Sequence, residues 1–114
     1  MIVEFYKKEI GNCPIEDFFD GLTAVQMRKT AWTLKIIKEY SAIPKQYFKK
    51  LSGTEDLWEV RVQAVSDKIR LLCFIEGDNL LILTGGFLKK SAKIPLKEIE
   101  IASNRKNDYK RKHK

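Results

Sequence analysis

The spacing of apolar residues changes once along this 114-residue chain, and that change constrains the fold more than any other feature. Before residue 44 the apolar residues recur at intervals of three and four, which is the period of an amphipathic helix. From residue 57 they alternate with polar residues, which is the period of a strand with one buried face. Helical segments near the start, followed by strands, predict an α+β domain.

Two helices are expected in the first part of the chain. Pro14 suits the first position of a helix, because the N–H that proline lacks would have no partner there. Gly21 should end this helix, and Thr23 with Gln26 three residues later has the form of a capping box. The second helix should therefore begin there and run to about Tyr40. Its apolar stripe is expected to comprise Ala24, Met27, Ala31 and Leu34, widened by Trp32 and Ile36.

Alternation and turn residues predict the strands. β-Branched and aromatic residues at 1–6 indicate a short first strand. Residues 57–62 (LWEVRV) place three apolar side chains on one side and Glu59 and Arg61 on the other. A hairpin follows, with strands at 68–76 and 80–87 joined by a tight turn.

A last helix should begin near Pro95, with Ile99, Ala102, Lys106 and Tyr109 on one face. The predicted order is thus βααβββα. It describes a small, mainly antiparallel sheet, two N-terminal helices packed on it, and a basic C-terminal helix. The length predicts one domain over residues 1–114, with the last eight or so residues as a flexible basic tail.

The net charge of +7 is confined to one part of the chain. Residues 1–43 carry six basic and six acidic side chains, whereas residues 44–114 carry 16 basic and nine acidic ones. A small basic domain suggests an anionic partner, most commonly nucleic acid. Much of the excess lies in three clusters, at residues 45–50, 89–93 and 105–114.

The cysteine and histidine counts exclude several kinds of site. Cys13 and Cys73 are not spaced as metal ligands, and His113 is the only histidine. A structural zinc site, a multi-histidine metal centre and a histidine-based triad are therefore not expected. Cys73 should be a buried thiol, and a disulfide with Cys13 stays open.

No apolar run approaches the roughly 20 residues of a membrane helix, and the first residues do not resemble a signal peptide. We therefore expect a cytoplasmic protein without a membrane partner.

Two arginines occupy strand positions where a purely structural domain has little need of charge. Arg61 points away from the apolar side of its strand, and Arg70 interrupts an apolar strand. Either arginine alone is explained by a solvated sheet face or by pairing with Glu59. On neighbouring strands, and with Lys89 and Lys90 just beyond the third, they would form one cationic surface. The planar guanidinium fork suits that surface to phosphate.

Four segments, taken in order, resemble a known family: residues 11–18 (GNCPIEDF), 57–62 (LWEVRV), 69–72 (IRLL) and 86–102 (GFLKKSAKIPLKEIEIA). Together they resemble the HigB-type, phage-derived branch of the RelE/ParE toxin superfamily. The last segment is the most specific of the four. The small sheet and two N-terminal helices of that family agree with the fold predicted from periodicity.

The resemblance implies the toxin of a type II toxin–antitoxin system. Such a toxin is an endoribonuclease that cuts translated mRNA on the ribosome without a metal or small-molecule cofactor, and so inhibits translation and growth. The RNA 2′-OH attacks the adjacent phosphorus. A cognate antitoxin, DNA-binding and HigA-like, is the implied protein partner.

The motif positions also imply the site residues. Arg61 and Arg70 are the expected phosphate-binding and transition-state groups, with Lys90 and Tyr109 completing the catalytic set. Tyr109 and His113 are the candidates for proton transfer, and a general base stays unassigned. A core contact of the last helix is the alternative for Tyr109, and a disordered terminus is the alternative for His113. The residues expected to hold RNA are Lys49, Lys50, Lys89, Lys93, Arg105 and Lys106.

Other functions stay open at this stage, because fold does not determine function. ParE-like gyrase inhibitors share the scaffold, so a toxin-fold protein that binds a protein target or nucleic acid without cutting RNA stays open, as does an inactive phage remnant. A phosphate-sized cationic site favours the nuclease, since a gyrase inhibitor does not need one.

Overall fold

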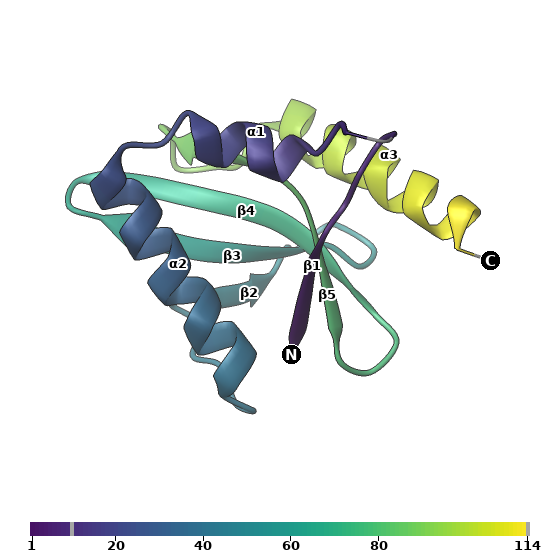
Figure 1. Ribbon diagram of the computed structural model, residues 1–114, viewed down its shortest axis with the longest axis horizontal. Coiled ribbons are helices and arrows are strands. Elements are labelled where there is room, and N and C mark those ends of the chain that lie inside the picture. The colour runs from purple at the N-terminus through teal and green to yellow at the C-terminus, as the bar shows by residue number, and fades with distance from the viewer. Residues whose placement is uncertain (10, 114) are drawn as a thin grey trace.

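A computed structural model describes residues 1–9 and 11–113 and places their strands in one twisted sheet (Figure 1). Three helices and five strands are assigned in these residues. In chain order they are β1 (Ile2–Phe5), α1 (Pro14–Asp20), α2 (Ala24–Glu39), β2 (Phe48–Lys50), β3 (Trp58–Ala64), β4 (Asp67–Glu76), β5 (Leu80–Lys89) and α3 (Leu96–Lys112).

The sheet has the strand order β1-β5-β4-β3-β2, with β1 parallel to β5 and the other pairs antiparallel. The domain is thus α+β with a mixed sheet, and the predicted order βααβββα is wrong. A further strand, β2, precedes β3. It has only three residues, of which two are Lys49 and Lys50, so its sequence is typical of a basic loop. Pairing with β3, in which Phe48 lies opposite Val60, makes it a strand.

The ends of the first two helices agree with the sequence. α1 begins at Pro14 and is followed by Gly21, whose N–H donates to the carbonyls of the last turn. The capping box of α2 is complete: the Gln26 N–H donates to Thr23 Oγ1 over 3.1 Å, and the Thr23 N–H donates to Gln26 Oε1 over 2.9 Å. These bonds satisfy two N–H groups that the first turn of a helix leaves free.

The buried face of α2 differs from the predicted stripe. Of the predicted residues only Leu34 is buried, and the other buried positions are Thr30, Thr33 and Ile37. The two threonine hydroxyls donate to the backbone carbonyls four residues earlier, so their burial leaves no hydroxyl unpaired. Trp32 consequently lies on the outward face of α2.

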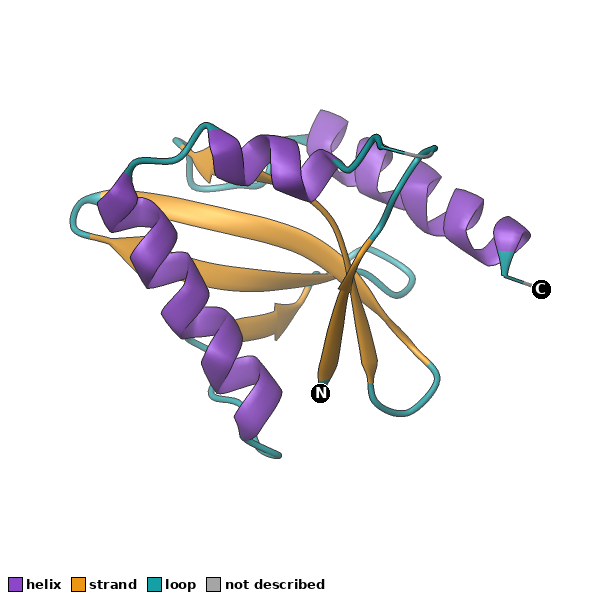
Figure 2. Cartoon of the chain, viewed as in Figure 1, coloured by secondary structure: helices purple, strands orange, loops and turns teal. Residues whose placement is uncertain are grey.

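Helices cover both faces of the sheet (Figure 2). α1 and α2 pack on one face through a cluster that includes Ile15, Ile37 and Leu71. On the opposite face, Ala102 of α3 packs with Phe74 and Ile82. Because they lie between these layers, β4 and β5 are buried along most of their length.

α3 continues through Lys112, so residues 107–112, which were expected in a flexible tail, form its last turns. Its C-terminal half is tied to the rest of the domain by polar contacts. The Tyr6 hydroxyl donates to Asp108 over 2.5 Å, and Lys110 Nζ lies 3.2 Å from a carboxylate oxygen of Glu76. Ile99, Ala102 and Tyr109 share the packed face, as the helical spacing predicts.

Cys13 and Cys73 are both buried and both free, so the open question of a disulfide is answered. None of the helices in residues 1–9 and 11–113 is long and apolar enough to cross a membrane.

Candidate nucleic-acid interface

The structure brings Arg61 and Arg70 together, because they are paired positions of β3 and β4. In the same way Lys49 lies opposite Glu59, and Lys68 lies opposite Lys89. Directly opposed residues of a pleated sheet share a face. These six residues therefore lie on the face away from α2, and we call them the cationic cluster: Lys49, Glu59, Arg61, Lys68, Arg70 and Lys89.

Glu59 lies at the centre of the cationic cluster and is only 5% exposed. Its Oε1 atom is 3.2 Å from Arg61 Nε and 3.9 Å from Arg70 Nε. The alternative that these arginines pair with Glu59 is therefore confirmed. A single carboxylate offsets only one of the five cations, so the cationic cluster keeps a net charge of +4.

Several polar atoms of the cationic cluster are buried without a hydrogen-bond partner among the described residues. They are Glu59 Oε2 and the Nε atoms of Arg61 and Arg70, whose contacts with Glu59 lack hydrogen-bond geometry. Buried polar groups are normally paired, because leaving them unpaired costs free energy. Unpaired buried atoms of this kind call for an explanation, and they mark Glu59 and the two arginines as candidates for a functional site.

The two arginines lie at different depths. The side chain of Arg61 is 31% exposed, whereas that of Arg70 is 5% exposed. Lys49 and Lys68 are exposed, and Lys89 is half-buried. An approaching anion would therefore meet Arg61 and the lysines first, with Arg70 beneath them.

The cations also shift one another's pKa. Burial lowers the pKa of the Arg70 guanidinium, and the charge of Arg61 lowers it further while Glu59 opposes the shift. Burial likewise lowers the pKa of the Lys89 ammonium, and Arg70 is the largest of the neighbouring charges that add to this effect. Like charges held together in this way favour binding of an anion, and perturbed groups of this kind concentrate at functional sites.

Other residues that the sequence assigned to RNA binding lie elsewhere. Lys50 is paired with Trp58, which places it on the opposite face from Lys49. Lys90 and Lys93 are exposed in the connection that follows β5. Arg105 and Lys106 are engaged within the fold, since Arg105 donates to the Thr84 carbonyl over 2.8 Å and Lys106 lies 3.4 Å from Asp56.

Tyr109 does not reach the cationic cluster. Its ring packs edge-on against Phe74, with the ring centroids 5.4 Å apart, and Phe74 is four positions beyond Arg70 on β4, roughly 13 Å along the strand. Burial raises the pKa of the Tyr109 hydroxyl, and the charges of Glu4 and Glu76 add to this shift. His113 stacks on Tyr109 at 4.0 Å. These two candidates for proton transfer are thus a packed pair at the C-terminal end of α3.

Two members of the cationic cluster were not among the predicted site residues: Lys68 was not considered, and Glu59 was named only as a possible partner of the arginines. Lys68 precedes Arg70 by two positions and Glu59 precedes Arg61 by two, so strand alternation places each pair on one face. That signal was available for both residues. The register between β4 and β5, which adds Lys89, could not be read from alternation.

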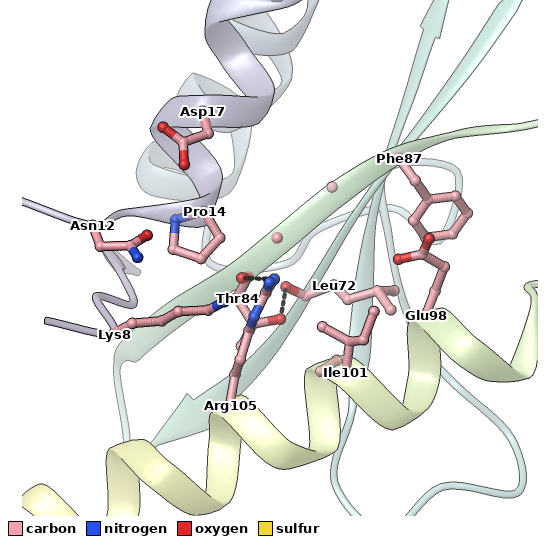
Figure 3. Close-up of a pocket in the computed structure, with 13 residues that line it drawn as sticks. Lys8, Asn12, Pro14, Asp17, Leu72, Thr84, Phe87, Glu98, Ile101 and Arg105 are labelled. Carbon is pink, nitrogen blue, oxygen red and sulfur yellow. Dashed lines mark hydrogen bonds between the residues drawn. The ribbon is translucent and has the colours of Figure 1, made fainter.

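A separate cavity of about 250 Å3 lies between the start of α1, the middle of β5 and α3 (Figure 3). The Arg105 guanidinium reaches into it and is held by the Thr84 carbonyl, while Lys8, Asp17 and Glu98 complete its charged lining. Two cations and two carboxylates give this cavity no net charge. It is therefore less suited to a polyanion than the cationic cluster.

In the part of the chain that the structure describes, no group of three or more His, Cys, Asp or Glu side chains is placed to hold a metal ion.

Comparison with known proteins identifies the family. None of the curated proteins compared matches the sequence significantly. Residues 17–107 match the family described as phage-derived protein Gp49-like (DUF891), and this span includes α2, every strand except β1, and all of the cationic cluster. The match covers most of the chain, so this protein belongs to the Gp49-like family of phage-derived proteins, a toxin-like family related to RelE.

Proposed function

We propose that this protein is the toxin of a type II toxin–antitoxin system and that it acts as a ribosome-dependent endoribonuclease, HigB-like in its action. It would cut translated mRNA and so inhibit translation and growth. The observation that carries the proposal is the cationic cluster, in which Arg61 and Arg70 lie opposite each other above a shared carboxylate. Membership of a toxin-like family supports the biological role.

The reaction we propose is transesterification within the RNA. The ribose 2′-oxygen forms a bond to the adjacent phosphorus, and the bond from phosphorus to the 5′-oxygen breaks. The products are a 2′,3′-cyclic phosphate and a 5′-hydroxyl, because the proton lost by the 2′-OH is balanced by one gained by the leaving oxygen. The protein must align these atoms and stabilise the charge that grows on the phosphoryl oxygens.

Each member of the cationic cluster then has a distinct role. Arg70, buried and paired with Glu59, gives a fixed donor whose position costs little reorganisation during the reaction. Arg61, at the exposed side, binds the phosphate as it enters. Lys49, Lys68 and Lys89 hold the flanking backbone, and Lys90 and Lys93 extend that contact along a longer RNA.

Glu59 is a positioning residue in this scheme, since it orients both guanidinium groups from below. Tyr109 and His113 receive no step, because they pack with each other and with Phe74 at the other end of β4. The scheme uses no metal ion and no small-molecule cofactor.

The proposed partners follow from this surface. The ribosome presents the mRNA, and a cognate antitoxin, DNA-binding and HigA-like, silences the toxin. An antitoxin that covered the cationic cluster would neutralise it directly, because the same cations bind phosphate and carboxylate.

The test is induction of the protein without an antitoxin, followed by primer extension on several messages. We expect growth arrest with breaks confined to translated regions. Purified protein should cut mRNA only when ribosomes are present, and stripping the protein of metal ions before the assay should not prevent cutting. Growth arrest with intact messages would contradict the nuclease and favour a binding toxin.

The structure also determines which variants test the site. Replacing both arginines by alanine would leave Glu59 buried without a cation, so the protein could fail to fold for an unrelated reason. A better variant combines Arg61→Gln with Arg70→Lys, which keeps a charge beside Glu59 but removes both planar forks. We expect it to fold and to lose cleavage, whereas Lys50→Gln, on the opposite sheet face, should stay active.

A further inference from the structure

A groove of about 460 Å3 lies on the side of the molecule formed by α2 and the turn between β3 and β4. Four of its lining residues are Val25, Arg28, Lys29 and Trp32, which follow the helical spacing i, i+3, i+4 and i+7 and so share one face of α2. That face differs from the one buried against the sheet. Val65, in the turn, completes the apolar lining.

Val65 has a conformation that needs explanation. It is 85% exposed and has φ 57°, and no other non-glycine residue of the described chain has a positive φ. It is the first residue of a two-residue hairpin turn, a position that favours glycine and disfavours a β-branched side chain. A strained and exposed apolar residue of this kind indicates a role for its side chain.

One hydrogen bond joins this turn to α2, and a second lies within the hairpin itself. Gln26 Nε2, in the first turn of the helix, donates to Asp67 Oδ2 over 3.0 Å. Gln63 Nε2 donates to the Val65 carbonyl over 2.9 Å. The side chain of Val65 is thus kept at the groove rather than free to move away.

The charge of the groove indicates what binds there. Among the described residues, Arg28 and Lys29 are the only charged ones that line it. The zero net charge of residues 1–43 conceals a division: residues 1–23 carry two basic and five acidic side chains, whereas residues 24–43 carry four basic and one acidic. A partner of the groove should therefore be acidic and should carry apolar side chains for Val25, Trp32 and Val65.

Single-stranded RNA fits this lining less well than protein does. A base needs an open aromatic face on which to stack. Lys29 Nζ lies over the Trp32 ring, 4.1 Å from its centroid, and Tyr47 packs edge-on against that ring. Val25 and Val65 offer aliphatic surface, which suits apolar side chains instead.

We propose that this groove is a docking site for an acidic protein segment whose apolar side chains pack between Trp32 and Val65. Carboxylates of that segment pair with Arg28 and Lys29. The cationic cluster lies on the sheet face that α2 does not cover, so a docked segment leaves the RNA surface accessible. The proposal does not depend on RNA cleavage.

The experiment selects peptides that bind the full chain from a displayed library of random peptides. The selected peptides are then synthesised, and their affinities are measured by calorimetry. We expect the selected peptides to be acidic with two or more apolar residues. The double variant Arg28→Glu, Lys29→Glu should weaken their binding by about tenfold or more. Val65→Gly should weaken binding while keeping or raising Tm, because glycine accepts a positive φ.

Matched controls are Leu96→Ala, an exposed leucine on α3, and Lys38→Glu, a lysine of α2 outside the groove. Both should bind the peptides as the unaltered chain does, and Val65→Gly should keep its affinity for an RNA oligonucleotide. The proposal is overturned if the selected peptides are neutral or basic, or if the groove variants bind them normally. It is also overturned if those variants instead lose affinity for an RNA oligonucleotide, or abolish self-association seen by sedimentation.

Discussion

Glu59 is the buried carboxylate of the cationic cluster, and it lies beside the cluster's two arginines. It is only 5% exposed and holds two arginines that are themselves paired positions on neighbouring strands. Removing one partner of a buried ion pair is costly, because the other charge is left without compensation. A variant of any one of the three side chains therefore needs a measurement of folding stability beside its activity.

We predict that Glu59→Gln separates RNA binding from RNA cleavage. Loss of the negative charge raises the net charge of the cationic cluster from +4 to +5, so affinity for RNA should stay the same or increase. The cleavage rate should fall by about tenfold or more, because the arginines are no longer held in place. Binding titrations and single-turnover rates on ribosomes measure the two effects. Glu55→Gln, in an exposed loop position, is the control, and an unchanged rate in Glu59→Gln would remove Glu59 from the site.

We predict that the charge of Lys89 increases affinity for RNA and lowers the stability of the fold. Its lowered pKa means that the folded protein disfavours the charged ammonium, so this charge destabilises the fold wherever lysine is protonated in both states. Lys89→Gln should therefore raise Tm at neutral pH, and the gain should vanish at alkaline pH, as lysine loses its proton in the unfolded chain as well. Affinity for RNA should fall in the same variant.

Thermal melts from neutral to alkaline pH and a salt-dependent RNA titration test this prediction, with the exposed Lys97→Gln as the control. A lower Tm for Lys89→Gln at neutral pH would show that Lys89 stabilises the fold instead.

At the scale of the element, the middle of β5 approaches α1 closely at Gly86. A Cβ atom on Gly86 would lie 2.5 Å from a ring carbon of Phe18 on α1 and 2.8 Å from a methyl carbon of Leu71. The register of β4 against β5 also shifts beside this point, between Leu72 and Cys73. The glycine is thus required by close packing rather than by its backbone angles.

We predict that Gly86→Ala destabilises the protein by about 1–3 kcal/mol, the usual cost of overpacking a core. Phe18→Leu should recover part of that loss when the two changes are combined, because it removes the ring that clashes. Chemical denaturation of the three variants gives the coupling energy. Gly21→Ala is the matched control, since its new Cβ would make only an ordinary 3.6 Å contact. Equal stability of Gly86→Ala and Gly21→Ala would contradict the packing argument.

The elements also differ in how far the sequence predicts them. α1, α2 and the β4–β5 hairpin were expected close to their observed bounds, because proline, the capping box and the turn are local signals. β2 was missed, because its three residues become a strand only through pairing with β3. The buried face of α2 was also predicted wrongly, since Thr30 and Thr33 are buried with hydroxyls bonded to their own helix.

At the scale of the whole molecule, Tyr6 and Asp108 join the segment after β1 to the last turns of α3. Burial, with the hydrogen bond to Asp108, raises the pKa of Tyr6 to about 12 from an ordinary value of 10.0. The hydrogen bond from Lys112 to Asp108, followed by the one from Tyr6, lowers the pKa of that carboxyl. The hydrogen bond between Tyr6 and Asp108 therefore stabilises the fold most at pH values above the titration of Asp108 and below that of Tyr6.

We predict that the protein loses stability as the pH rises from 10.0 to about 12, because the Tyr6 hydroxyl then ionises in the unfolded chain while the folded state still holds its proton. Tyr6→Phe should be less stable than the unaltered chain at neutral pH and should lack this alkaline loss. Denaturant titrations at several alkaline pH values measure the difference, with the exposed Tyr40→Phe as the control. Parallel pH curves for the unaltered chain and Tyr6→Phe would contradict the assignment.

The α+β class, most helix ends and the location of the charge excess follow from the sequence alone, because these features depend on neighbours a few residues apart. The sequence also placed Arg61 and Arg70 on strands that could meet. The tertiary structure decided which cations share a surface, because strand register brought Lys49, Lys68 and Lys89 to the arginines and left Arg105 and Lys106 to bind within the fold. Register depends on contacts between residues far apart in the chain, and side-chain alternation alone does not specify it.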